Sequence, residues 1–266
     1  MKAWMKRPNW IRSILLVTLF CVSPLAVDAA DLPTIQRRGR LIVAVKANLA
    51  PLGFRDEQGQ LQGFEIDVAR QVAQELLGNA AAVEFKPVLN QDRGRMVLAG
   101  EVDFAIAQLT PTPSRLRLFE FSRSYYRDGI AIATADARLT STAELQGQTI
   151  AVLAGSQAIE AVRRRMPSAV LRPVTSYQAA KGLLDTGDAQ AIAADVSVLA
   201  GWVREFPQYR ILPGVLATHE LAIAFPRGQQ YASLRQEVDQ IVTRLHNSRW
   251  LETRAQVWGL PRLLSF

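Results

Sequence analysis

Short apolar runs alternate with amphipathic stretches along the first half of the chain. Residues 41–45 are all apolar, and three of the five are β-branched, which is typical of a buried strand. From Phe64 an apolar residue recurs every four positions to Leu76, which predicts a helix that ends at Gly78. Strands are also predicted at 83–87 and 104–107, with a helix at 92–99 between them. This order favours a parallel sheet with crossover helices.

The same alternation resumes after residue 130 and predicts a second α/β unit. The expected strands are 130–134, 149–153, 189–193, 209–212 and 221–225. The expected helices are 155–166, 177–184, 198–206, 234–245 and 249–258.

The first 29 residues have a different pattern, which predicts a secretory signal peptide. Four basic residues precede an apolar run from Ile14 to Val22, and small residues follow before Ala30. A transmembrane anchor is the alternative, but the run is only half of the roughly 20 residues that span a bilayer. Lipidation of Cys21 is a further alternative, although Phe20 is bulky where such processing sites have a small residue.

Composition and charge narrow the functional classes. Of 266 residues, 49% are hydrophobic and 21% charged, which excludes a disordered chain or a polytopic membrane protein. Removal of residues 1–29 also removes Cys21, the one cysteine, and lowers the net charge from +7 to +4. This weak charge predicts no nucleic-acid partner, and Arg163–Arg165 is interpreted as a solvated helix face. With His219 and His246 far apart in sequence, no metal or cofactor is predicted.

Six stretches in one order carry a resemblance to a known family. They are 63–77, 100–104, 110–115, 121–126, 145–152 and 221–228. In this order and spacing, from about Leu41 to Trp258, the chain resembles the amino-acid-binding family of bacterial periplasmic solute-binding proteins, the family 3 receptors of polar amino-acid ABC transporters.

The resemblance implies an α/β fold of two lobes, the type II periplasmic-binding-protein fold, with the ligand in the cleft between them. Lobe 1 would combine residues 30–124 with 222–266, and lobe 2 would be the insertion 130–216. Two hinge strands, near 124–129 and 217–222, would connect the lobes. Closure of such a cleft buries a ligand from both sides.

An α-amino acid needs a partner for its carboxylate and another for its ammonium group, because an unpaired buried charge is costly. The planar fork of an arginine suits the carboxylate. Arg115 matches the family's carboxylate-binding arginine, and Thr110 would add its hydroxyl and N–H as donors. The alternative is that Arg115 is a surface arginine like Arg117.

Asp195 matches the family's ammonium-binding aspartate. It follows an apolar strand, at the strand end where α/β sheets bind ligands. The alternative is that it caps the helix after it. The loop formed by Gly155, Ser156 and Gln157 resembles the family's second carboxylate contact, since helix N-termini attract anions. Here too Ser156 could simply be a helix N-cap.

Four positions depart from the family's pattern. Leu49 and Asn90 stand where aromatic rings often surround the ligand, and Gln108 stands where Ser or Gly is common. Lys46 occupies a position that is often acidic in receptors for basic amino acids. A lysine there would favour an anionic side chain, unless it points to solvent. We therefore expect an acidic or neutral polar ligand, with glutamate or aspartate ahead of glutamine.

The predicted function is a periplasmic, monomeric, non-enzymatic receptor that delivers an amino acid to a membrane-embedded ABC permease. One alternative is an enzyme like cyclohexadienyl dehydratase, which acts on prephenate-like substrates and needs a positioned general acid. Glu101, Glu120 and Glu220 are candidates by residue type only. Another alternative is a soluble partner of a signalling sensor.

Overall fold

The computed structural model describes residue 1 and residues 30–261. The predicted signal peptide and its alternatives therefore fall, apart from Met1, outside the described residues. Within the described part of the chain, no helix is both long and apolar enough to cross a membrane.

The first α/β unit is built around strand β1 (Leu41–Val45), which is buried along its whole length. It pairs in parallel with β5 (Val83–Pro87) on one side and β6 (Phe104–Ile106) on the other. The crossovers contain α2 (Phe64–Leu77) and α3 (Asp92–Leu98). The parallel arrangement predicted from the sequence is confirmed, and α2 ends at Gly78 in the left-handed conformation as its pattern indicated.

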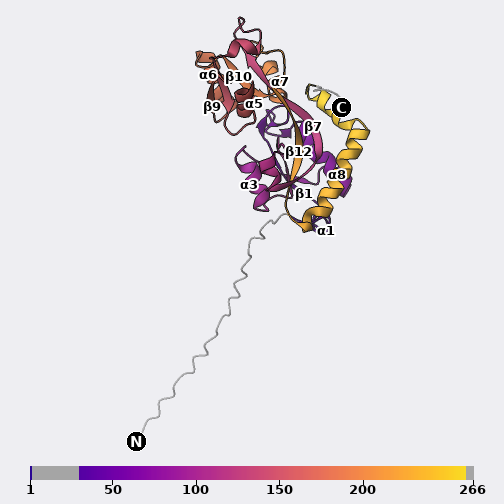
Figure 1. Cartoon of the computed structure of the whole chain (residues 1–266). Helices are drawn as coiled ribbons and strands as arrows, with labels where there is room; N and C mark the ends of the chain where they lie inside the picture. The colour runs from indigo at the N-terminus through magenta and orange to yellow at the C-terminus, as the bar shows by residue number, and fades with distance from the viewer. Residues whose placement is uncertain (2–29, 262–266) are drawn as a thin grey trace.

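Two long antiparallel strands run from this unit to the second (Figure 1). They are β7 (Phe119–Thr134) and β12 (Ala217–Pro226), which pair from Ala217 opposite Ile130 to Pro226 opposite Phe119. The pairing shifts register around Ala222. The apolar pattern predicted only 130–134 of β7 and 221–225 of β12, because polar residues interrupt it in the rest of both strands.

The second unit continues the same sheet through β10 (Ala191–Asp195). The full order is β5-β1-β6-β12-β7-β10-β8-β9, and β11 also pairs with β7. The other elements of this unit are β8 (Thr149–Leu153), β9 (Val170–Val174), β11 (Arg210–Ile211), α5 (Ala158–Arg165), α6 (Tyr177–Thr186) and α7 (Val196–Glu205).

Several short elements were not predicted, and two C-terminal helices were. Helices α8 (Ala232–Asn247) and α9 (Trp250–Val257) lie close to the expected ranges. The unpredicted elements, besides β9, are α1 (Leu32–Arg38), β2 (Asn48–Leu49), β3 (Gly53–Arg55), β4 (Leu61–Gln62), α4 (Pro113–Leu116), η1 (Thr142–Leu145) and η2 (Gln229–Tyr231).

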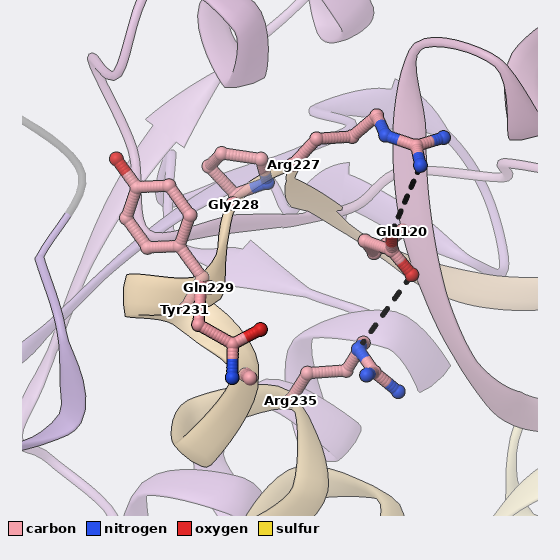
Figure 2. A pocket seen from close by; sticks show the side chains of 8 residues that line it. Glu120, Arg227, Gly228, Gln229, Tyr231 and Arg235 are labelled. Atoms are coloured by element: carbon pink, nitrogen blue, oxygen red, sulfur yellow. Dashed lines mark ion pairs between the residues drawn. The ribbon is translucent and has the colours of Figure 1, made fainter.

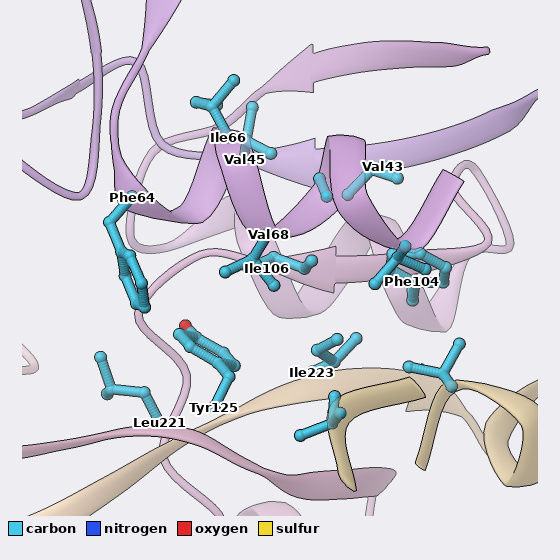
Figure 3. Packing of buried hydrophobic residues seen from close by; sticks show 14 of the residues in the cluster. Val43, Val45, Phe64, Ile66, Val68, Phe104, Ile106, Tyr125, Leu221 and Ile223 are labelled. Carbon is cyan, nitrogen blue, oxygen red and sulfur yellow. The ribbon is translucent and has the colours of Figure 1, made fainter. Parts of the chain in front are cut away.

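Buried apolar side chains form separate clusters at the two ends of the sheet. In the first unit, Phe64, Phe104, Tyr125 and Ile223 pack between the sheet and α2 and α8 (Figure 3). A second cluster covers the opposite face under α3. Two further clusters lie against the two faces of the second unit. The molecule is therefore a two-lobed α/β protein, as the resemblance implied.

Helix α7 brings the second lobe against the first. Its residue Val198 belongs to the main apolar cluster of the first lobe. At Gly201, an added Cβ would lie 2.8 Å from the Ala50 carbonyl oxygen and 3.2 Å from Cδ of Pro51. Only a residue without a side chain lets the helix approach the backbone this closely. The two lobes therefore touch at this point.

Candidate functional site

A cleft of about 830 Å³ lies between residues of the two lobes. The loop after β1 and the start of α3 line it on one side, and the loop after β8, α6 and α7 line it on the other. Its volume lies within the range of small-molecule sites. Of the predicted site residues, the structure places Lys46, Leu49, Asn90 and Arg115 in its lining.

Arg115 lies in α4, a four-residue helix capped by Thr112. The Arg115 N–H donates to Thr112 Oγ1 at 3.3 Å, and its Nη1 donates to the Thr110 carbonyl oxygen at 3.2 Å. Burial lowers the pKa of the guanidinium, and the charge of Asp195 opposes this effect. Thr110 itself is not among the cleft-lining residues, so its contribution in this structure is to hold Arg115.

Gln108 lies two residues after the end of β6 and has a left-handed backbone, with φ 53°. Its N–H donates to Glu65 Oε1 at 2.7 Å, and its carbonyl oxygen accepts from Arg93 Nη1 at 2.7 Å. The amide Nε2 of Gln108 is buried and finds no partner among the described residues. Gln108 is not among the lining residues, but Arg93, which holds its carbonyl, is.

Ser156 and Gln157 directly follow Gly155, which lines the cleft. The helix after them begins at Ala158 with Gln157 in the N-cap position and no side-chain cap. The interpretation of Ser156 as an N-cap is therefore wrong. Ser156 Oγ and Gln157 Nε2 are buried and have no partner in the described part of the chain. Unsatisfied buried polar atoms are rare, but neither residue is among those that line the cleft, so a ligand contact by Ser156 or Gln157 stays a prediction.

Asp195 occupies the N-cap position of α7, but its side chain makes no capping bond. Instead its Oδ1 lies 2.9 Å from His219 Nε2. The Ser197 N–H, which an N-cap side chain would normally bind, donates to Asp128 Oδ1 at 3.1 Å. The capping interpretation of the Asp195 side chain is therefore wrong. Asp195 does not line the cleft, yet its charge acts on Arg93 and Arg115, which do.

Asp128, Asp195 and His219 each offer one ligand atom within 4.8 Å of one another. Within residues 30–261 this is the group where a metal ion would find three such atoms. However, His219 Nε2 is already bonded to Asp195, and both oxygens of Asp128 accept bonds, one from Gly129 N–H and Ser197 N–H and the other from Ser197 Oγ. We assign this group to hydrogen bonding and not to a metal.

Lys46, which directly follows β1, lines the cleft and is only 3% exposed. Burial and the neighbouring charge of Arg93 lower its pKa to about 8, against the opposing effect of Glu65. The interpretation that Lys46 points to solvent is therefore wrong. Basic residues dominate the lining of the cleft. They are Lys46, Arg55, Arg93, Arg115 and Lys181, against the single acidic residue Glu205.

Four aromatic side chains that sequence reasoning missed also line the cleft, namely Phe54, Tyr177, Trp202 and Phe206. Trp202 packs edge-on against Tyr177 and Phe206, with ring centroids 6.4 Å and 5.8 Å apart. Its Nε1 is buried without a partner among the described residues. The apolar pattern of 198–206 predicts a helix with one buried face, and it does not show whether the aromatic residues on that face line a cleft or pack in the core.

A second pocket, of about 410 Å³, contains none of the predicted site residues. Glu120 lies there between two arginines, and dashed lines in Figure 2 mark its ion pairs. Its Oε1 is 3.5 Å from Arg227 Nη2, and its Oε2 is 3.8 Å from Arg235 Nε. Glu101 pairs with Arg95 at 2.6 Å. Glu220 pairs with Arg127 at 3.3 Å. None of these three glutamates is among the residues that line the cleft.

Comparison with solved structures agrees with the two-lobed fold. The solute receptor for L-cysteine of Neisseria gonorrhoeae is 26% identical, with a TM-score of 0.77 over 86% of this chain and 93% of that one. The ancestral amino acid-binding protein AncCDT-1, described as a precursor of cyclohexadienyl dehydratase, is 25% identical, with a TM-score of 0.74 over 86% of this chain and all of that one.

Sequence comparison gives relatives of the same kind. A glutamine-binding protein of Geobacillus stearothermophilus is 32% identical over 184 residues, which cover 68% of this chain and 70% of that protein. The ABC transporter glutamine-binding protein GlnH of Bacillus subtilis is 26% identical over 86% of this chain and 89% of that protein. The family model for bacterial extracellular solute-binding proteins, family 3, matches residues 41–261. The chain therefore belongs to the bacterial extracellular solute-binding proteins of family 3.

Proposed function

We propose that the protein is a periplasmic receptor that binds an amino acid in the cleft and delivers it to an ABC permease. The observation that carries this proposal is the electrostatic interaction between Arg115, which lines the cleft, and Asp195, which lies outside its lining. They have opposite charges, come from different lobes and interact electrostatically beside one cleft. An α-amino acid carries an ammonium and a carboxylate group on the same carbon, so it can neutralise both residues at once.

The charge of the cleft favours an acidic or neutral polar ligand, with glutamate or aspartate ahead of glutamine. Five basic residues and one acidic residue line it. Once Arg115 holds the α-carboxylate, Lys46 and Arg93 are left to attract a second anionic group. A cationic side chain would be repelled by the same residues. The relatives named for glutamine binding support a ligand of this size and polarity.

We assign residues 30–124 and 222–266 to lobe 1 and residues 130–216 to lobe 2. The apolar clusters support this division. Those of the second unit draw on residues 130–217, whereas those of the first draw on residues 30–126 and 221–260, with Val198 of α7 and Tyr177 of α6 as the exceptions. A ligand that contacts both lobes would favour the closed arrangement by population shift.

Relatives named as ABC transporter binding proteins support a permease as the partner. The family's description as extracellular and the pattern of residues 1–29 support export to the periplasm. We expect the receptor to act as a monomer that docks transiently. Light scattering of the purified protein, which should give a mass near that of one chain, tests this point.

The experiment that tests the function is a ligand screen on protein that has been unfolded and refolded to remove any carried ligand. Thermal shifts with the twenty amino acids and prephenate identify hits, and calorimetry then measures their affinity. We expect glutamate, aspartate or glutamine to bind at micromolar affinity, about −8 kcal/mol. Binding of prephenate with release of phenylpyruvate would instead support the enzymatic alternative, and no shift with any amino acid would contradict the receptor proposal.

A further inference from the structure

Three buried side chains lie together where β7 and β12, paired antiparallel, run between the lobes. Asp128 of β7 and His219 of β12 are directly paired across the strands, and Asp195 ends the neighbouring β10. Asp128 is fully buried, Asp195 is 7% exposed and the His219 side chain is 6% exposed. Below, these three residues are called the Asp–His cluster.

The contacts within the Asp–His cluster determine what Asp195 is free to do. Asp128 accepts the Ser197 N–H and Oγ bonds and so caps α7 from a neighbouring strand. The Asp195 carboxylate is thereby released from capping, and His219 holds it at 2.9 Å. Neither Asp128 nor His219 lines the cleft. Asp195 does not line it either, but its charge acts on Arg93 and Arg115, which do, so Asp128 and His219 can influence a bound ligand through the position and charge of Asp195.

We propose that Asp128 and His219 are positioning residues for the ammonium-binding carboxylate of Asp195, and that ligand binding displaces a proton from the Asp–His cluster. The proposal rests on the proposed function, because it takes Asp195 as the partner of a ligand ammonium group.

The net charge of the Asp–His cluster explains why a proton and a ligand ammonium group should compete. Two carboxylates and one imidazole hold two negative charges when they share no proton, one when they share one proton, and none when they share two. Two adjacent buried carboxylates do not both stay ionised without a compensating charge. With one shared proton, the cluster is a monoanion that a ligand ammonium neutralises. A second proton supplies the same charge, so proton and ammonium compete.

The titration of the cluster supports this competition. Burial and the charge of Asp195 raise the pKa of Asp128 to about 7. Burial lowers the pKa of His219, but its bond to Asp195 and the charges of both aspartates outweigh burial and raise it overall. The other titratable groups that interact with the cluster are Arg93 of α3, Arg115 of α4, Tyr125 and Tyr126 of β7, and Tyr177 of α6.

The direct test is calorimetry of the wild-type protein with L-glutamate and L-glutamine between pH 5.5 and 8.5, in two buffers that differ in ionisation enthalpy. Neither ligand side chain titrates between pH 6 and 8, since a glutamate side chain titrates near pH 4.3. For a proton with a pKa of about 7 that ligand binding displaces, linkage predicts binding about tenfold weaker at pH 6 than at pH 8. At pH 7 the same linkage predicts release of about half a proton.

Variants identify the groups responsible. His219→Gln keeps an N–H donor for Asp195 but cannot gain a charge, so the tenfold difference should fall to less than about threefold. Asp128→Asn keeps an acceptor for the Ser197 N–H and should move the pH dependence to lower pH. His246→Gln is the matched control, because His246 contacts the Ser124 carbonyl of β7 through Nε2 and lies outside the cluster. It should retain the wild-type profile.

Two results would overturn the proposal. One is binding to the wild-type protein that is flat from pH 6 to 8 with no proton released. The other is a wild-type profile that persists in both His219→Gln and Asp128→Asn, which would place the proton elsewhere. Absence of binding by any amino acid at any pH would overturn the proposed function itself, and this inference with it, so the two failures are distinguishable.

Discussion

The two charged ends of the candidate site are built in different ways. Arg115 depends on residues three and five positions before it, through Thr112 Oγ1 and the Thr110 carbonyl oxygen. Asp195 depends on His219 and on Asp128, which lie 24 and 67 positions away and come from the two strands that join the lobes. The proposed carboxylate-binding end is held by residues close in sequence within one lobe, whereas the proposed ammonium-binding end is assembled from three strands.

This difference has an energetic consequence. A change at the Arg115 end should remove a ligand contact and leave the rest of the site intact. A change at the Asp195 end alters a buried network in which the charge of each group depends on the others. The effects of two substitutions on binding free energy are then not expected to add. The following predictions test that contrast, from the largest expected effect to the smallest.

Substitution Arg115→Ala should weaken L-glutamate binding about 100-fold or more, because truncation of one partner in a desolvated charge pair costs several kcal/mol. The melting temperature should change little, since Arg115 is only half-buried. Calorimetry measures the affinity, and Arg117→Ala, at an exposed arginine two positions away, is the control. Unchanged affinity in Arg115→Ala would remove Arg115 from the site.

Substitution Gly201→Ala should weaken binding of the same ligand about tenfold, or 1.4 kcal/mol. The added Cβ would lie 2.8 Å from the Ala50 carbonyl oxygen, so the two lobes must move apart. Gly182→Ala in α6 is the matched control, because its Cβ meets no atom within 4 Å. That variant should bind normally and gain about 0.5–1 kcal/mol in stability. Equal affinities in the two variants would contradict lobe contact at Gly201.

Substitution Lys46→Met should reduce the affinity for L-glutamate about fivefold to tenfold, because the lost attraction to the second carboxylate of the ligand corresponds to about 1 kcal/mol. The affinity for L-glutamine should change by less than about twofold, because its side chain carries no charge. The apolar stem stays similar in length, so the effect reports the charge. Lys86→Met, at a half-exposed lysine that pairs with Glu84, is the control. Equal losses for the two ligands would show that Lys46 does not read the ligand side chain.

Substitution Asp128→Asn should make the melting temperature less dependent on pH, so that the difference in melting temperature between wild type and variant changes by several degrees from pH 5 to pH 8. Burial raises the pKa of Asp128 to about 7, so the folded protein holds a proton that the unfolded chain releases near pH 3.9. The stabilising contribution is therefore complete below pH 4 and is lost as the pH rises to about 7. Calorimetric melting at pH 5 and pH 8 should show the wild type losing stability relative to the variant. A constant difference would contradict the raised pKa.

Much of the fold could be predicted from the sequence, because apolar periodicity is a local signal. Strands 41–45, 83–87 and 149–153 and the helix from Phe64 agree with the structure. The pattern failed at β7, whose middle section contains Arg127 and Asp128. There the backbone hydrogen bonds come from antiparallel pairing with β12, which lies about 90 positions away in the chain. A local pattern therefore does not show this pairing.

The candidate site could be predicted only in part. The family pattern pointed to Arg115 and Asp195, and the structure relates them electrostatically. It did not point to Asp128 or His219, because residues that come together from three separate strands have no characteristic spacing in the sequence. Trp202 was missed for a different reason, since an aromatic residue on an apolar helix face usually belongs to the core.

The central claim is that one ligand places its carboxylate at Arg115 and its ammonium at Asp195. The most direct test is calorimetry with three related compounds, L-glutamate, glutarate without the ammonium, and γ-aminobutyrate without the α-carboxylate, on wild type, Arg115→Ala and Asp195→Asn. We predict that glutarate, which has no ammonium group for Asp195, binds the wild type and Asp195→Asn with equally weak affinity. Likewise, γ-aminobutyrate, which has no α-carboxylate for Arg115, should bind the wild type and Arg115→Ala with equally weak affinity. A further loss of glutarate affinity on Asp195→Asn substitution, or of γ-aminobutyrate affinity on Arg115→Ala substitution, would contradict the assignment.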